Sequence, residues 1–76
     1  MTKAKTDYST FTITVKEDGE GNPWIMCEPD QPGLPAIGDG FLGLRLRDGI
    51  EIREAEEIAE YLNDHIEGVS HTQFIK

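Results

Sequence analysis

Few side chains in this sequence have the type and the spacing that site chemistry requires. Cys27 is the single cysteine, and the two histidines, His65 and His71, lie far from it along the chain. A zinc site needs four ligands at short characteristic spacings, which these residues do not supply. A Cys–His catalytic pair needs a third group to orient the base, and the sequence shows none. We therefore predict that Cys27 is a small buried hydrophobic residue and that the chain is not an enzyme.

A glycine-rich segment from Gly38 to Gly43 matches the G-x-G-x-x-G pattern of dinucleotide-binding proteins. That pattern binds a pyrophosphate only where a strand precedes it and a helix follows, because the helix amides face the phosphates. Here a proline-rich segment precedes the glycines and a strand pattern follows them. We therefore predict a glycine turn, with no nucleotide or other cofactor.

A second segment, from Asp18 to Asn22, has the oxygen spacing of the first half of a calcium-binding loop. Such a loop needs a glycine at its sixth position and a bidentate glutamate at its twelfth. This chain has Pro23 and Pro29 at those positions. A solvated hairpin turn is the better interpretation, and we predict no metal site.

Length and charge exclude several classes of protein. The 76 residues suffice for one hydrophobic core and one domain. Fifteen acidic and seven basic side chains give a net charge of −8, which repels phosphates, so we predict no nucleic-acid partner. We find no membrane-spanning stretch and no signal-peptide pattern, and one cysteine excludes an intramolecular disulfide. We expect a cytoplasmic protein, and we infer no small-molecule substrate.

Alternation and turn residues predict three strands. Residues 9–16 alternate β-branched or aromatic side chains with polar ones, which is the period of a half-buried strand. Glycines and acidic residues at 17–22 predict a turn, and residues 23–27 predict the hairpin partner. Three prolines and three glycines make residues 28–40 a loop, of a length that is often functional. Residues 41–47 alternate again and predict the third strand.

The clearest helical period lies in residues 53–67, where apolar side chains form one stripe and acidic side chains cover the remaining surface. Gly68 is expected to stop this helix, and residues 69–75 are a candidate closing strand. The sequence therefore predicts an α+β fold, with an antiparallel sheet of three or four strands and one amphipathic helix packed on one face. Residues 1–8 are expected to form a flexible tail, and residues 9–76 a single domain.

Five residues are candidates for contact with a partner: Trp24, Leu34, Phe41, Arg45 and Arg47. Trp24 either covers the core or joins Leu34 and Phe41 in an exposed patch, and tryptophan is enriched where interfaces concentrate binding energy. Arg45 and Arg47 are expected on one strand face. There they either pair weakly with nearby carboxylates or meet an acidic partner or a second copy of the chain.

Most of the chain, from Trp24 to Thr72, resembles a group of short bacterial proteins of unknown function and of about this length. The resemblance rests on Pro32-Gly33-Leu34-Pro35, on the segment from Gly38 to Leu46, and on a helix with Glu54-Ala55-Glu56-Glu57-Ile58-Ala59 and Leu62-Asn63. It implies no activity.

A second resemblance is to the core of HicB-type antitoxins. It rests on the hairpin, on Pro29-Asp30-Gln31-Pro32-Gly33, on Gly38-Asp39, and on a helix with Glu54-Ala55 and Tyr61-Leu62. The resemblance implies a protein that binds and blocks a small basic RNA-cleaving toxin. This sequence departs from the family's pattern, because residues 41–53 insert a strand and a turn where the family's helix follows the Gly-Asp pair directly.

The sequence as a whole predicts a non-catalytic module that binds another protein or a second copy of itself. An open three-stranded sheet has two edges, and pairing one edge across a two-fold axis would give a homodimer. The alternative is an antitoxin-like inhibitor that binds a small basic protein. The acidic helix surface would then be a docking face, and otherwise it is simply solvated.

Overall fold

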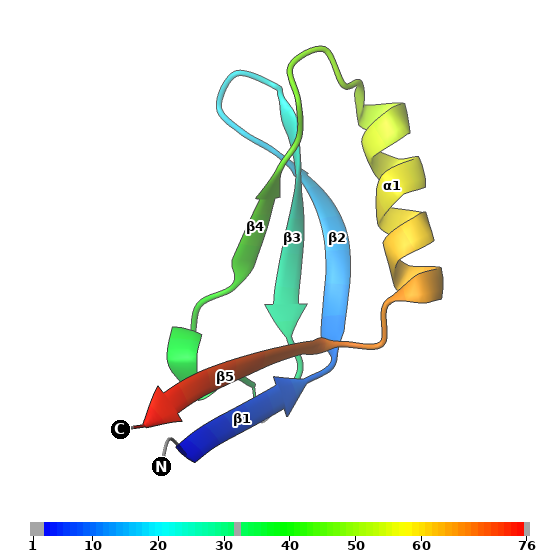
Figure 1. The fold of residues 1–76 in the computed structure, drawn as a ribbon. Helices are drawn as coiled ribbons and strands as arrows, with labels where there is room; N and C mark the ends of the chain where they lie inside the picture. The colour runs from blue at the N-terminus through cyan, green and yellow to red at the C-terminus, as the bar shows by residue number, and fades with distance from the viewer. Residues whose placement is uncertain (1–2, 32, 76) are drawn as a thin grey trace.

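The computed structural model describes residues 3–31 and 33–75. These residues form five β-strands, a short 3₁₀ helix and one α-helix (Figure 1). The strands are β1 (Lys3–Ser9), β2 (Phe11–Glu17), β3 (Pro23–Pro29), β4 (Leu42–Arg45) and β5 (Val69–Ile75). The helices are η1 (Pro35–Ile37) and α1 (Ile52–His65). The predicted α+β class is confirmed, with one three-stranded and one two-stranded antiparallel sheet.

The three-stranded sheet has the order β2-β3-β4 and contains the predicted hairpin. Ile13 pairs with Cys27 and Val15 with Ile25, and directly opposed residues of antiparallel strands lie on the same face. The alternation in β2 therefore places its apolar side chains on the same face as Ile25 and Cys27. β4 continues this face through Leu42, which pairs with Cys27.

Helix α1 covers this apolar face, principally over β2 and β3 (Figure 1). Its two buried residues, Ala55 and Ala59, have small side chains, which allow the helix backbone to approach the sheet closely. Ile25, Cys27 and Ala59 form the buried cluster, so the predicted burial of Cys27 is confirmed. The half-buried side chains around it are Phe11, Ile13, Val15, Leu42, Leu46, Ile58 and Leu62. Among the described residues, no helix combines the length and apolar character that crossing a bilayer requires.

The turn between β2 and β3 is organised by one carboxylate. Asp18 Oδ1 accepts hydrogen bonds from the backbone amides of Glu20 at 2.8 Å and of Asn22 at 2.9 Å. The amides of Asn22 and Glu20 lower the pKa of Asp18, because they stabilise its ionised form. The segment that resembles half a calcium loop is therefore a hairpin turn whose aspartate is bonded to its own backbone.

The second sheet is a two-stranded ribbon, here called the β1–β5 ribbon. β1 pairs with β5 over seven residues, from Lys3 opposite Ile75 to Ser9 opposite Val69. The expectation of a flexible tail is therefore wrong for residues 3–8, and residues 1–2 lie outside the described range. Residues 69–75 do form a strand, but that strand joins β1 and not the three-stranded sheet (Figure 1).

Two polar side chains connect the base of this ribbon to the larger sheet. Asp30, just after β3, accepts hydrogen bonds from the hydroxyls of Thr10 at 2.7 Å and Thr12 at 3.0 Å. The buried hydroxyl of Ser9 donates to the carbonyl oxygen of Asp30 at 3.2 Å. These bonds fix the corner where β1 ends and β2 begins, and they thereby set the direction in which the ribbon leaves the sheet.

The element bounds differ from the predicted ones by one or two residues in β2 and β3, and three further differences affect the placement of candidate residues. β4 ends at Arg45, so Leu46 and Arg47 lie in the connection to the helix. α1 ends at His65, three residues before Gly68, and the extended residue Ile66 follows it. The predicted loop at 28–40 contains the end of β3 and the single turn of η1, and its residue Pro32 lies outside the described part of the chain.

Candidate protein-binding surface

The face of the three-stranded sheet opposite α1 carries a row of three aligned side chains. Lys16 of β2 is opposite Trp24 of β3, and Trp24 is opposite Arg45 of β4. Opposed residues share a face, so one aromatic ring lies between two cations in a single line across the sheet. The next row on the same face holds Thr14, Met26 and Gly43. This register brings together residues from three separate stretches of the chain.

The ring of Trp24 packs against Gly43 and stacks on Phe41. Its ring lies over Gly43, where a Cβ atom would be 3.4 Å from Cζ3 of the indole. Phe41 stacks on it with ring centroids 5.7 Å apart and an interplanar angle of 25°. Trp24 is half-buried and Phe41 is 50% exposed, so the pair is held in place and still presents apolar surface. We call Lys16, Trp24, Met26, Phe41 and Arg45 the Trp24 face.

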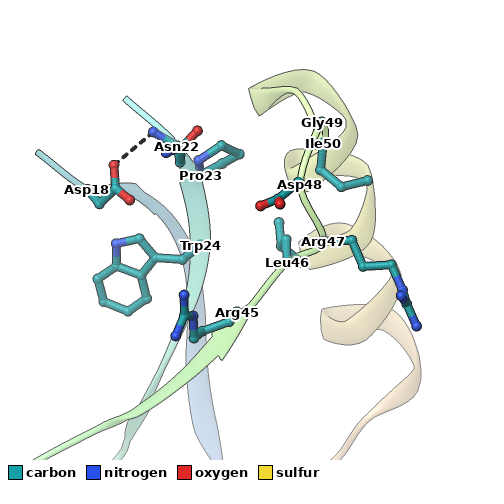
Figure 2. A pocket seen from close by; sticks show the side chains of 10 residues that line it. All are labelled: Asp18, Asn22, Pro23, Trp24, Arg45, Leu46, Arg47, Asp48, Gly49 and Ile50. Carbon is teal, nitrogen blue, oxygen red and sulfur yellow. Dashed lines mark hydrogen bonds between the residues drawn. The ribbon is translucent and has the colours of Figure 1, made fainter. Parts of the chain in front are cut away.

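The two arginines proposed as partner contacts point in different directions. Figure 2 shows Arg45 beside Trp24, whereas Arg47 extends away from that ring. The expectation that both lie on one strand face is wrong, because β4 ends at Arg45 and strand alternation stops there. Within the described part of the chain, the one ion pair joins Arg53 and Glu57, so Lys16 and Arg45 contact no carboxylate.

A shallow hollow of about 300 Å³ adjoins the Trp24 face, between the β2–β3 turn and the connection from β4 to α1 (Figure 2). Trp24 and Arg45 border it on one side, and Asp18 and Asp48 contribute carboxylates. The remaining lining residues are Asn22, Pro23, Leu46, Arg47, Gly49 and Ile50. The hollow therefore extends the contact surface beyond the aromatic pair and can admit a side chain of a partner.

Leu34 does not belong to this surface. Only 3% of its area is exposed, so it is part of the buried interior. The prediction that Leu34 contributes to an exposed patch with Trp24 and Phe41 is therefore wrong. Three prolines around it made the segment resemble an open loop, but Leu34 caps the N-terminus of η1 and its side chain is buried. Sequence reasoning also missed Lys16 and Met26, because only the register places them next to Trp24.

The hydroxyl of Thr14, in the row next to Lys16 and Trp24 on the same sheet face, has no hydrogen-bond partner among the described residues although it is buried. An unpaired buried hydroxyl costs about 1–3 kcal/mol in protein mutational data. We expect Thr14→Val to increase the free energy of unfolding by about 1 kcal/mol, measured by urea denaturation. Thr12→Val is the matched control on the same strand, and it should destabilise the fold because its hydroxyl bonds Asp30. A stability loss in Thr14→Val would contradict this interpretation.

The residues considered for catalysis lie apart from one another and from the Trp24 face. Burial raises the pKa of the Cys27 thiol, which disfavours the reactive thiolate. The ring of His65 stacks on Tyr61 with centroids 4.1 Å apart, and its Nδ1 lies 2.8 Å from the Tyr61 carbonyl oxygen. His71 lies in β5, opposite Asp7. Within residues 3–31 and 33–75, no three His, Cys, Asp or Glu side chains are grouped so that they could hold a metal ion.

The segment at 28–40 borders a second hollow, of about 500 Å³, in which every charged lining residue is acidic. Glu28, Asp30 and Asp39 contribute carboxylates to it. Both carboxylate oxygens of Asp30 already accept hydrogen bonds from threonines, so this residue is structural. Gly38 and Gly40 follow η1, and Gly43 lies within β4, so a strand follows the first glycines as the sequence predicts.

Comparison with known proteins finds no match among protein-family models, curated proteins or solved structures.

Proposed function

We propose that this protein is a non-catalytic module that binds another protein through the Trp24 face. The observation that carries the proposal is the row of Lys16, Trp24 and Arg45 on the sheet face that α1 leaves uncovered. Tryptophan and arginine are the residues that most often dominate binding energy at protein interfaces. The stacking of Phe41 and the support from Gly43 hold the indole in one position, which reduces the entropy lost on binding.

The partner that fits this surface is a protein segment with carboxylates on either side of an apolar side chain. The apolar group would lie on Trp24 and Phe41, and the carboxylates would meet Lys16 and Arg45. The net charge of −8 opposes an acidic partner at long range. At physiological ionic strength, however, charges more than about 8 Å apart are largely screened, so the two adjacent cations dominate.

The environment of Cys27 supports a role without catalysis. The one thiol of the chain is enclosed in the core, and its raised pKa keeps it protonated at neutral pH. A lone, buried, reduced cysteine also suits the cytoplasm, where disulfides rarely persist, and we propose that location. We propose neither a cofactor nor a small-molecule substrate nor a nucleic-acid partner.

Charge reversal at one arginine tests this function, with the other arginine as the control. Arg45→Glu should weaken partner binding by about tenfold or more, because it removes a cation beside Trp24 and adds a repelling charge. Arg47→Glu changes the net charge equally but points away from the Trp24 face, so binding should be retained (Figure 2). The measurement is affinity capture from native cells with the tagged full chain, followed by mass spectrometry. If both variants lost partner binding equally, the change in net charge would be the cause, and the result would contradict binding at the Trp24 face.

A second candidate function follows from the helix. The side chains of Glu54, Glu57, Glu60 and Asp64 on α1 are exposed, and a HicB-like antitoxin would offer such a surface to a basic toxin. The same capture experiment separates the two candidates. A small basic protein that is lost with Glu60→Lys but retained by Arg45→Glu would favour the antitoxin-like role over the Trp24 face.

A further inference from the structure

The β1–β5 ribbon is the part of the molecule with the least support from the rest of the fold. Its two strands pair with each other and run across one end of the three-stranded sheet (Figure 1). In β5 every residue except Val69 is exposed, and in β1 every residue except Asp7 and Ser9 is exposed. Phe74, with 70% of its area exposed, lies in this ribbon.

An isolated two-stranded ribbon is at best marginally stable in water, and additional strands are the usual remedy. The ribbon has two edges, and they differ in chemistry. β1 carries Lys3, Lys5 and Asp7, and charged side chains, lysine above all, protect an edge strand from pairing with another chain. Of the strands in the described residues, β5 alone contains no Lys, Arg, Asp or Glu, and it has no proline. Its outer edge is therefore the unprotected one.

Charge also indicates what can approach this edge. Residues 10–68 hold four basic and fourteen acidic side chains, whereas the ribbon holds two lysines and one aspartate. Two copies of the chain repel each other through their bodies, and this repulsion is weakest where the ribbons meet. A second copy brings a strand with the same uncharged sequence, so pairing β5 with itself places no like charges opposite each other.

We propose that β5 pairs with β5 of a second copy across a two-fold axis, which gives a homodimer. The two ribbons then form one antiparallel sheet with the order β1-β5-β5-β1. The closed symmetry explains the distribution of charge, because the lysines of β1 lie on the outer edges and stop further strand addition. This inference uses residues distinct from the Trp24 face, and the dimer would present two such faces.

Two threonines provide a matched test. Thr6 and Thr72 are opposite each other in the ribbon, and their hydroxyl oxygens lie 2.9 Å apart. Thr72→Lys and Thr6→Lys break the same hydrogen bond and add the same charge. Thr72 is the middle residue of β5 (Val69–Ile75), so it lies next to the two-fold axis when the two β5 strands pair over their full length. In that register only Thr72→Lys places the added charge beside its own two-fold mate, so it should weaken the dimer by about tenfold or more while Thr6→Lys does not.

The measurement is light scattering behind size exclusion over a concentration series, at near-physiological salt. One chain has a mass of 8.5 kDa, and the wild-type protein should have twice that mass in solution. Thr72→Lys should have the mass of a single chain at concentrations where Thr6→Lys remains dimeric. A monomeric wild type overturns the proposal, as does a dimer that Thr6→Lys disrupts and Thr72→Lys leaves intact.

If Thr72→Lys does not fold, hydrogen exchange of the wild-type protein replaces this test. Exchange at β5 amides that slows with protein concentration supports the dimer, and exchange independent of concentration overturns it. Arg45→Glu should leave the mass unchanged, so failure here and failure of the Trp24 face are distinguishable.

Discussion

Ile25→Ala should lower the free energy of unfolding by about 3 kcal/mol, since truncating a buried isoleucine typically costs about 2–5 kcal/mol. Ile25 is 0% exposed, and among the described residues it has the largest side chain that is completely buried. It lies on the central strand, between Val15 of β2 and Leu44 of β4, on the face that α1 covers. The paired strands on both sides hold the backbone in place, so we expect the truncation to leave a cavity. For a domain of this length, we expect a fall in melting temperature of more than about 10 °C.

Urea denaturation followed by circular dichroism measures this loss, with Ile66→Ala as the control. Ile66 is 44% exposed and follows the last residue of α1, so its truncation should cost less than about 1 kcal/mol. Equal costs for the two variants would mean that the core is not centred on β3.

Gly68→Ala should cost about 2 kcal/mol, because overpacking at a tight contact typically costs about 1–3 kcal/mol. A Cβ atom at this position would lie 2.5 Å from the Ser9 carbonyl oxygen and 2.7 Å from the Tyr8 hydroxyl oxygen. Gly68 is not among the glycines with positive φ, so the cost arises from contact and not from backbone strain. The end of β1 would have to move, and the β1–β5 ribbon would lose its junction with the body of the protein.

Gly19→Ala is the control for this glycine. It also lacks a positive φ, and a Cβ atom there would meet no other atom within 4 Å. Its effect on stability should stay within about 0.5 kcal/mol. Hydrogen exchange should show faster exchange at residues 3–9 and 69–75 in Gly68→Ala and not in Gly19→Ala. Unchanged exchange in the ribbon would contradict the role assigned to Gly68.

The contact between Gly68 and the end of β1 could not be predicted from the sequence. A glycine just past a helical period is typical of a helix stop, and that prediction placed the end of the helix two residues too late. The chain leaves α1 at Ile66 in an extended conformation, and the glycine is required by the approach of β1, which is almost sixty residues away in sequence. No local pattern contains that contact.

Strand β1 was missed for a related reason. Its residues, Lys-Ala-Lys-Thr-Asp-Tyr-Ser, do alternate, but the less polar positions hold only Ala4, Thr6 and Tyr8, so the segment resembles a small polar tail more than a half-buried strand. Its hydrogen bonds come from β5 at the other end of the chain. By contrast, β2 and α1 each bury one face against the core, and their periodicity made them predictable. β3 was predicted from its run of apolar residues directly after the turn at 17–22.

The candidate site was partly predictable. Trp24, Phe41 and Arg45 were identified by residue type, and the structure brings them together. Lys16 and Met26 were not identified, because their position beside Trp24 depends on strand register. The lengths of the loops at 18–22 and 30–41 do not determine that register from sequence alone. Arg47 was assigned to the same face because strand alternation was extended two residues beyond the end of β4.

The central claim is that partner binding occurs on the Trp24 face, and Trp24 itself is the most direct reporter because the chain has one tryptophan. The measurement is a titration of its fluorescence with the protein captured from native cells. We predict a shift to shorter wavelength as water is displaced from the indole, with an affinity that Arg45→Glu weakens by about tenfold or more and Arg47→Glu leaves unchanged. Binding of that protein without any change in Trp24 emission, or with the same affinity in Arg45→Glu, would contradict the account. So would the failure of the wild-type chain to retain any protein.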